Sequence, residues 1–350
     1  MVRLTRAQTQ ERTRSGVLAA ARAEFADRGY RDATIDGIAA RAGLTRGAIY
    51  ANFAGKRALY LSVLAADAER AARTGHGDAA GTVTPREALG AIARARLGSG
   101  LPADVLDDEP ARAAYAQLLE LEALVLGLAL ERLGLRGRAV RVAASALTLL
   151  AGADHLATAA PGFVDQFDVV AACELLTALP ADRGWPRAYL QHVSPARPVD
   201  EPWPDGPAPR DGVVHVLGLC RLEAAEESVR SAPAGAAVTV ALVTGEPDEL
   251  APLARLVLAR LDATLRRAIP ERARPPVRLL LGPAADALAA AAGVTEPSDG
   301  TEVAVRVAAG RIVAHADGRG AGAAPATRPR WCPSRQPWRA LPERPPGVRA

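Results

Sequence analysis

Thr34–Lys56 read TIDGIAARAGLTRGAIYANFAGK. Apolar residues recur in the first half of this stretch at three- and four-residue spacing, which predicts a helix with one buried face. Thr34 precedes the face and can cap the helix through its hydroxyl group, and Gly43 follows it and can adopt the left-handed backbone at which helices stop. The residues of the face are Ile35, Ile38, Ala39 and Ala42.

A second short helix is predicted directly after this glycine. Thr45 can act as its N-cap, so that the helix begins at Arg46. Ile49 and Phe53 lie four residues apart and point inward. The outward residues are Arg46, Tyr50 and Asn52. A helix, a glycine turn and a second short helix form a helix-turn-helix, although an ordinary helical hairpin gives a similar pattern.

The segment resembles the DNA-binding domain of the TetR/AcrR family of transcriptional regulators. Asn52 departs from the family, where histidine is common, and Gly37 and Gly55 replace residues better suited to forming or capping a helix. Gly37 inside a helix is expected to cost about 1 kcal/mol relative to alanine. The matching positions are Phe25, Gly29, Thr34, Ile38, Ala39, Ala42, Gly43, Thr45, Gly47, Ile49, Tyr50, Phe53 and Lys56.

The residue types around the second helix predict how it contacts DNA. Arg46 can donate two parallel hydrogen bonds to guanine in the major groove, and the small residues beside it let the backbone approach the bases. Hydroxyl, amide and ammonium groups nearby can bind phosphate, and Lys56 lies at a helix N-terminus, which favours an anion. The predicted DNA-binding residues are Thr34, Thr45, Arg46, Gly47, Ala48, Tyr50, Ala51, Asn52 and Lys56.

Positive charge is unevenly distributed along the 350 residues. The net charge is only +4, yet residues 1–60 hold eleven basic against five acidic residues, and residues 318–350 hold seven arginines against Glu343. Local positive charge is typical of proteins that bind polyanions. Lys56 is the single lysine of the chain, at a position where the resemblance expects one.

The remaining composition narrows the class of protein. Cys173, Cys220 and Cys332 are too far apart for a disulfide framework or a sequence-local zinc site, so we expect no metal, no cofactor and a reducing cytoplasmic location. Polar residues interrupt the N-terminus, so no signal peptide is expected. No apolar stretch reaches about 20 residues, so no membrane span is expected. Neither a nucleophile elbow nor a P-loop occurs, and we expect no enzyme activity.

We predict five segments along the chain. Residues 1–56 form the DNA-binding domain, with Phe25, Ile38, Ile49 and Phe53 at the centre of its core. Residues 57–180 form an all-α domain for effector binding and dimerisation, residues 181–212 a Pro-rich linker, residues 213–318 an α/β domain, and residues 319–350 a disordered Arg/Pro-rich tail.

Two apolar helices in the second segment, residues 139–159 and 164–179, are apolar on more than one face. Such helices are buried or meet a partner chain, and the resemblance implies a homodimer interface. Internal packing alone is the alternative. The resemblance also implies an unknown small-molecule effector bound between the helices. Candidate lining residues are Tyr115, Leu118, Leu119, Leu126, Leu150, Asp154 and His155.

Strands alternate with helices after the linker, which predicts an α/β domain. Their order and the closing hairpin of residues 302–315 resemble a thioredoxin-like fold, although another α/β module such as a ligand-sensing domain remains open. Cys220 lies at the first strand-to-helix turn, where a helix N-terminus can lower a thiol pKa. The position three before it is Leu217, however, so no internal disulfide can form and a buried, inert cysteine is the alternative.

Two functional hypotheses follow from the sequence. The first is a dimeric regulator, by resemblance a repressor, that binds a palindromic operator in double-stranded DNA and responds to a small molecule. The second is a redox-responsive regulator or oxidoreductase that acts through the C-terminal domain.

Overall fold

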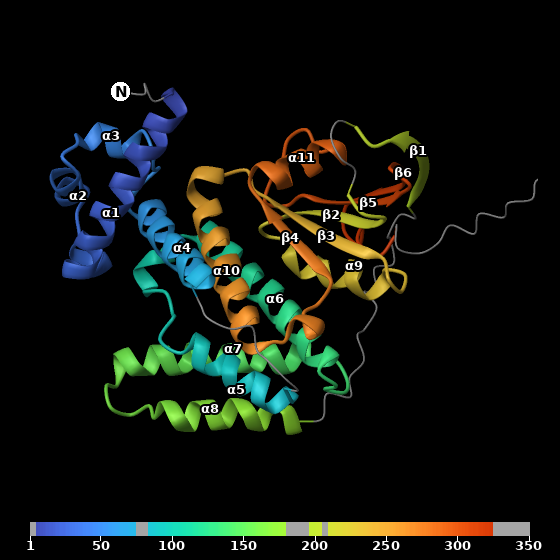
Figure 1. Ribbon diagram of the computed structural model, residues 1–350, viewed down its shortest axis with the longest axis horizontal. Helices are drawn as coiled ribbons and strands as arrows, with labels where there is room; N and C mark the ends of the chain where they lie inside the picture. The colour runs from blue at the N-terminus through green and yellow to red at the C-terminus, as the bar shows by residue number, and fades with distance from the viewer. Residues whose placement is uncertain (1–4, 75–82, 180–195, 205–208, 325–350) are drawn as a thin grey trace, which may run out of the picture.

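The computed structural model describes residues 5–74, 83–179, 196–204 and 209–324. Figure 1 shows three regions: a group of helices at one end, a layer of longer helices, and a sheet on the far side. The group at the end, which we call the head, consists of α1 (Arg6–Asp32), α2 (Ile35–Ala42) and α3 (Arg46–Tyr50). Most of the predicted linker and residues 325–350 of the predicted tail lie outside the described residues. The start of the predicted disordered tail is a correction, because Gly320 and Ala321 are buried and their N–H groups donate to the Glu302 carboxylate at 2.7 and 3.2 Å.

The head has a hydrophobic core of its own. Phe25, Ile38, Ile49 and Phe53 are buried together in it, as predicted. Gly29 adopts φ 71° and kinks α1 three residues before its end. The core also includes Val17 and Ala21 of α1 and Leu59 and Val63 of α4, so the head is anchored on the next helix.

The second region contains α4 (Lys56–Thr74), α5 (Pro85–Arg96), α6 (Glu109–Arg132), α7 (Val140–Ala159) and α8 (Gln166–Leu175). A capping box starts α5, since the Thr84 hydroxyl accepts from the Glu87 N–H and the Glu87 carboxylate accepts from the Thr84 N–H at 2.8 Å. Within the described residues, α6 and α7 are long and apolar enough to cross a membrane by length and composition. Most of α6 is buried inside the helical layer, however, as in the core helix of a globular protein.

The third region is a six-stranded mixed sheet. Its order is β1-β6-β5-β2-β3-β4, with β2, β3 and β4 parallel and the other neighbours antiparallel. The strands are β1 (Arg197–Pro202), β2 (Gly212–Gly218), β3 (Ala237–Val243), β4 (Val277–Leu281), β5 (Glu302–Ala308) and β6 (Arg311–Asp317). The helices are α9 (Ala225–Ser231), α10 (Pro247–Ala268) and α11 (Pro283–Ala291). The predicted α/β character and closing hairpin are confirmed, whereas the thioredoxin-like assignment stays a prediction.

The first strand corrects the sequence interpretation. Residues 197–202, placed in the predicted linker 181–212, form β1 and pair with β6. The error has a physical reason, because Pro198 and Pro202 argue against a strand in the sequence but are tolerated at the edge of a sheet. The α/β region therefore begins before the predicted boundary at residue 213.

The two faces of the sheet enter different cores. Val214 and Val216 of β2 pack with α11 in one cluster, whereas Leu217 and Leu219 belong to the large cluster that also fills the helical layer. Strand β3 alternates in the same way. The sheet is therefore buried on both faces, and one of those faces is continuous with the core of the second region.

Helix α10 makes this connection. It runs along α4 and also contacts α5 and α6 (Figure 1). Leu253, Leu256 and Leu261 of α10 are at most 2% exposed and share a cluster with Leu89 of α5 and Leu118 of α6. The predicted domain boundaries stay a prediction. In space, the second and third regions share one hydrophobic core.

Ion pairs also join the second and third regions at the edge of their shared core. Arg255 donates two hydrogen bonds to Glu69 at 2.6 and 2.8 Å, and Arg230 donates two to Glu131 at 2.6 and 2.7 Å. Parallel guanidinium–carboxylate bonds fix orientation as well as distance. The pairs between the two regions include Arg57–Glu249, Glu69–Arg255, Glu131–Arg230 and Arg138–Glu226.

Candidate DNA-binding surface

The turn between α2 and α3 is built as the sequence predicts. The Thr34 hydroxyl accepts from the Gly37 N–H at 3.0 Å and caps α2. Gly43 adopts φ 64° and ends that helix, and the Thr45 hydroxyl accepts from the Ala48 N–H at 3.3 Å to start α3. Two threonine side-chain caps and one left-handed glycine therefore fix where α2 begins and ends and where α3 begins.

The outer face of α3 is available to solvent. Thr45, Arg46, Gly47 and Ala51 are exposed and Tyr50 is 44% exposed. Ala48 is half-buried, and Ile49 closes the opposite side against the core. The helix thus presents an arginine and small residues together, as direct contact with base edges requires.

Arg46 makes only weak side-chain contacts on this face. Its guanidinium donates to the Tyr50 hydroxyl at 3.5 Å and lies 3.7 Å from Asp36. The hydrogen bond to Tyr50 and the Asp36 charge raise the pKa of Arg46. Solvent screens exposed pairs of this kind, so Arg46 can exchange them for contacts to DNA at little cost.

Asn52 and Lys56 have structural roles that the sequence interpretation missed. The Asn52 amide donates to the Ala48 carbonyl at 2.9 Å. The Lys56 ammonium donates to the carbonyl oxygens of Arg31 and Ala33 at 3.0 and 3.1 Å. Lys56 therefore secures the end of α1 against α4, and one of its three N–H donors is left for the predicted phosphate contact.

Gly37 also has a role that the sequence did not reveal. A Cβ atom at this position would lie 2.4 Å from the Oε1 atom of Glu24, which is buried beneath α2. Glu24 in turn accepts from Arg41 at 2.7 Å and lies 3.3 Å from Arg28. The glycine makes room for a buried carboxylate that ties α1 to α2, so it is more than a poor helix former.

The predicted effector-binding residues differ in burial. Leu126 and Leu150 are at most 3% exposed and belong to the continuous core, whereas His155 is exposed on α7. Leu119 and Tyr115 are half-buried, and burial raises the pKa of Tyr115. Helix α10 packs against α5 and α6 in the same core. Effector binding by these residues stays a prediction.

Among the described residues, neither cysteine has the lowered pKa that a reactive thiol needs. Burial, together with the charges of Asp299 and Glu223, raises the pKa of Cys220 instead of lowering it, and Cys173 is fully buried. Cys332 lies outside the described residues. Because the thiolate is the reactive form, the redox alternative loses the feature on which it depended.

Comparison with known proteins places the head in a family. Residues 17–63 match the family described as bacterial regulatory proteins, tetR family. Two relatives from Pseudomonas putida, the HTH-type transcriptional regulator SrpR and the uncharacterized HTH-type transcriptional regulator TtgW, are each 46% identical over 65 residues. These residues make up 19% of this chain, 30% of SrpR and 48% of TtgW. The family match spans the helix-turn-helix and its core, whereas the aligned residues make up less than half of either relative, so the similarity shown is that of the head to the DNA-binding domain of tetR-family regulators.

Proposed function

We propose that this protein is a homodimeric, cytoplasmic repressor of transcription that binds a palindromic operator and responds to a small-molecule effector. The observation that carries this proposal is the outer face of α3, where a weakly held arginine and small residues are exposed above a packed core. A polar surface of this kind on an otherwise well-packed helix fits the major groove of DNA.

On DNA, Arg46 reads sequence and its neighbours set position. The guanidinium leaves Tyr50 and Asp36 and donates to guanine O6 and N7. Ala48 and Ala51 lie close enough to the bases to meet a thymine methyl group. Thr34, Tyr50, Asn52 and Lys56 contact phosphates, which fixes the register but carries no sequence information.

Dimerisation is supported by exposed aromatic and aliphatic side chains on α7 and α8, in the loop between them and just after α8. Phe163 is 74% exposed and Phe167 is 86% exposed. Leu156, Leu175 and Leu179 are exposed in the same region. Within the described residues, only Tyr50 of the exposed large apolar side chains lies elsewhere. A large exposed apolar patch marks an interaction site, and a second copy of the chain covers it in the proposed dimer.

Two copies joined through α7 and α8 present two α3 helices to one duplex. A spacing of about 34–36 Å between them matches one turn of DNA. The operator is then an inverted repeat, because the symmetry of the protein is reflected in the site. Repression follows when such a site overlaps a promoter.

The experiment is selection of bound duplexes from a random library with the purified full-length chain. We expect an inverted repeat to be enriched and its binding to weaken steeply with salt. Phe167→Asp should give a monomer in sedimentation equilibrium and lose cooperative binding to the full repeat. The exposed α6 change Ala116→Asp serves as the control. Enrichment of no symmetric site would refute the proposal.

A further inference from the structure

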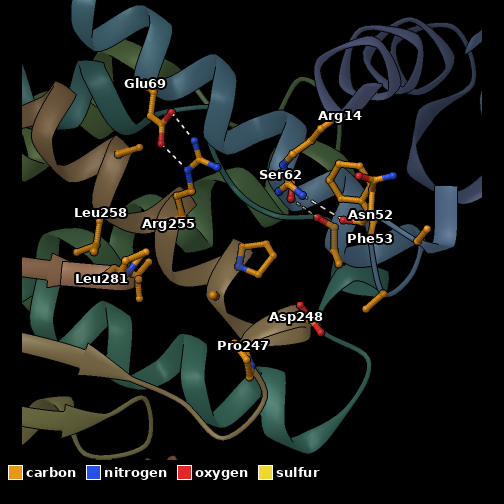
Figure 2. A pocket seen from close by; sticks show the side chains of 18 of the residues that line it. Arg14, Asn52, Phe53, Ser62, Glu69, Pro247, Asp248, Arg255, Leu258 and Leu281 are labelled. Carbon is orange, nitrogen blue, oxygen red and sulfur yellow. Dashed lines mark hydrogen bonds and ion pairs between the residues drawn. The ribbon is translucent and has the colours of Figure 1, made fainter. Parts of the chain in front are cut away.

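A cavity of about 720 Å³ lies between the head, α4 and the N-terminal part of α10 (Figure 2). Its head side includes Arg14, the C-terminal end of α3 at Tyr50, and the residues that follow to Ala54. Its far side is formed by α10 and by the end of β4 at Leu281. We call this space the head–α10 cavity. Its volume is that of a small-molecule site, and the carboxyl end of a parallel strand is a common place for one.

The wall contributed by α10 and β4 is mainly apolar. Pro252, Leu258 and Leu281 line it, with Ala251 and Ala259 between them. Glu69 and Arg255 close one side, but they neutralise each other through two hydrogen bonds. This wall suits a hydrocarbon or aromatic body.

Arg14 supplies an uncompensated charge on the head side. Its guanidinium stacks 4.5 Å from the Phe53 ring centroid and donates to the Asn52 carbonyl at 3.1 Å. Within the part of the chain that the structure describes, no carboxylate pairs with it. Arg14 and the Glu69–Arg255 pair lie on opposite sides of the cavity in Figure 2. Asp248 also lines the cavity, but it is exposed in the first turn of α10, where the helix dipole offsets its charge.

We propose that the head–α10 cavity binds an amphipathic organic acid and that this is where the effector of the regulator acts. The acid group pairs with the free N–H donors of Arg14, and the apolar body lies against Pro252, Leu258 and Leu281. This inference rests on the proposed function for its regulatory part. It places the effector outside the helical layer, whose interior α10 already occupies.

The position of the cavity explains how the ligand controls DNA binding. Its two sides belong to different cores, the core of the head and the continuous core that contains α10. Tyr50 and Asn52 at the end of α3 form part of the wall. A bound ligand therefore favours one position of the head relative to α10 and lowers the affinity for the operator, with a coupling of about 5- to 150-fold.

The binding test uses 2-naphthoate and its neutral counterpart 2-naphthamide as probes in calorimetric titrations of the full-length chain without DNA. We expect naphthoate to bind at least about tenfold more tightly than naphthamide, because only the acid forms charge-assisted bonds. Ala251→Phe fills the cavity and should abolish binding of both probes. Arg14→Gln should remove the preference for the acid. Ala287→Phe on α11 and Arg12→Gln on α1, both exposed and outside the cavity, are the matched controls.

Two results overturn the binding site: dissociation constants weaker than about 5 mM for both probes, or undiminished binding by Ala251→Phe. The regulatory part is tested separately with a duplex from the selection. Probe binding that leaves duplex affinity unchanged refutes the coupling. If no duplex is selected at all, the proposed function fails, whereas the titrations still decide the site.

Discussion

The head and the α/β region are both attached to the helical layer, but in different ways. The head keeps its own core around Phe25, Ile38 and Phe53 and reaches the rest of the molecule through α4. The α/β region sends α10 into the helical layer, and one face of its sheet is part of the same core. The head therefore has a core that is separate from the rest, whereas the α/β region and the helical layer share one core.

The largest effect is expected from removing the α/β region. A chain of residues 1–179 lacks Leu253, Leu256 and Leu261, which fill the core beside α5 and α6. We expect this chain to lose cooperative thermal unfolding and to bind a hydrophobic dye, because a continuous apolar surface becomes exposed. A cooperative transition measured by calorimetry on residues 1–179 would show that the two regions are independent.

Single truncations in the two cores should separate them. Phe53→Ala should cost about 3–5 kcal/mol and Leu256→Ala about 2–5 kcal/mol. Hydrogen exchange followed by mass spectrometry should show faster exchange confined to α1–α3 for Phe53→Ala. For Leu256→Ala it should show faster exchange in both the helical layer and the sheet. If both changes accelerate exchange in the same peptides, the two cores are not separate.

Gly37→Ala tests the buried carboxylate within the head. Helix propensity alone predicts a gain of about 1 kcal/mol. The structure predicts a net loss, on the order of 1 kcal/mol, because the new Cβ displaces Glu24 from Arg41. Urea unfolding of Gly37→Ala and of the double variant Glu24→Ala/Gly37→Ala measures this. The two changes should be less harmful together than their separate effects suggest, and strict additivity would contradict the packing argument.

A smaller effect, which arises in the α/β region, is the pH dependence of the folding stability. Burial, followed by the charge of Glu302, raises the pKa of Glu227 to about 7 from an ordinary value near 4.5. The folded protein therefore holds this proton more tightly, and the associated stability, fully present below about pH 4.5, is lost as the pH rises through about 7. Burial lowers the pKa of His215 to about 3, which acts in the opposite direction below about pH 6.5.

The difference between wild type and Glu227→Gln isolates the Glu227 effect. The stability of wild type relative to this variant should fall as the pH rises from about 5 to about 8. This range includes the pKa of Glu227 in the folded protein, about 7. Melting temperatures at a series of pH values measure it. Exposed Glu271→Gln is the control. Parallel curves for wild type and Glu227→Gln would contradict the raised pKa.

The head could be predicted in detail because its structure is local. Caps at Thr34 and Thr45, a stop at Gly43 and inward Ile49 and Phe53 are fixed by residues within one turn of each other. What could not be predicted depends on distant partners. The apolar face of α10 is visible in the sequence, but nothing in it says whether that face covers the sheet or the helical layer.

Dependence on distant residues also explains why the sequence interpretation missed the roles of Gly37 and Lys56. Gly37 resembles a weak helix residue until Glu24 is seen beneath it, and Lys56 resembles a free cation until the carbonyl oxygens of α1 appear beside it. Leu126, a predicted effector residue, is buried in the large core, and periodicity alone cannot distinguish a core position from a pocket wall. The contact between Arg14 and Phe53 joins residues that are distant in the sequence and leaves no local pattern.

The central claim is that α3 reads DNA through Arg46, and the specificity ratio tests it most directly. This ratio compares the dissociation constants for a scrambled and a selected duplex, measured by fluorescence anisotropy at one fixed salt concentration. We predict that Arg46→Ala lowers the ratio by about 5- to 150-fold, equivalent to about 1–3 kcal/mol, while leaving affinity for the scrambled duplex nearly unchanged. An Arg46→Ala protein that keeps the wild-type ratio would contradict the account.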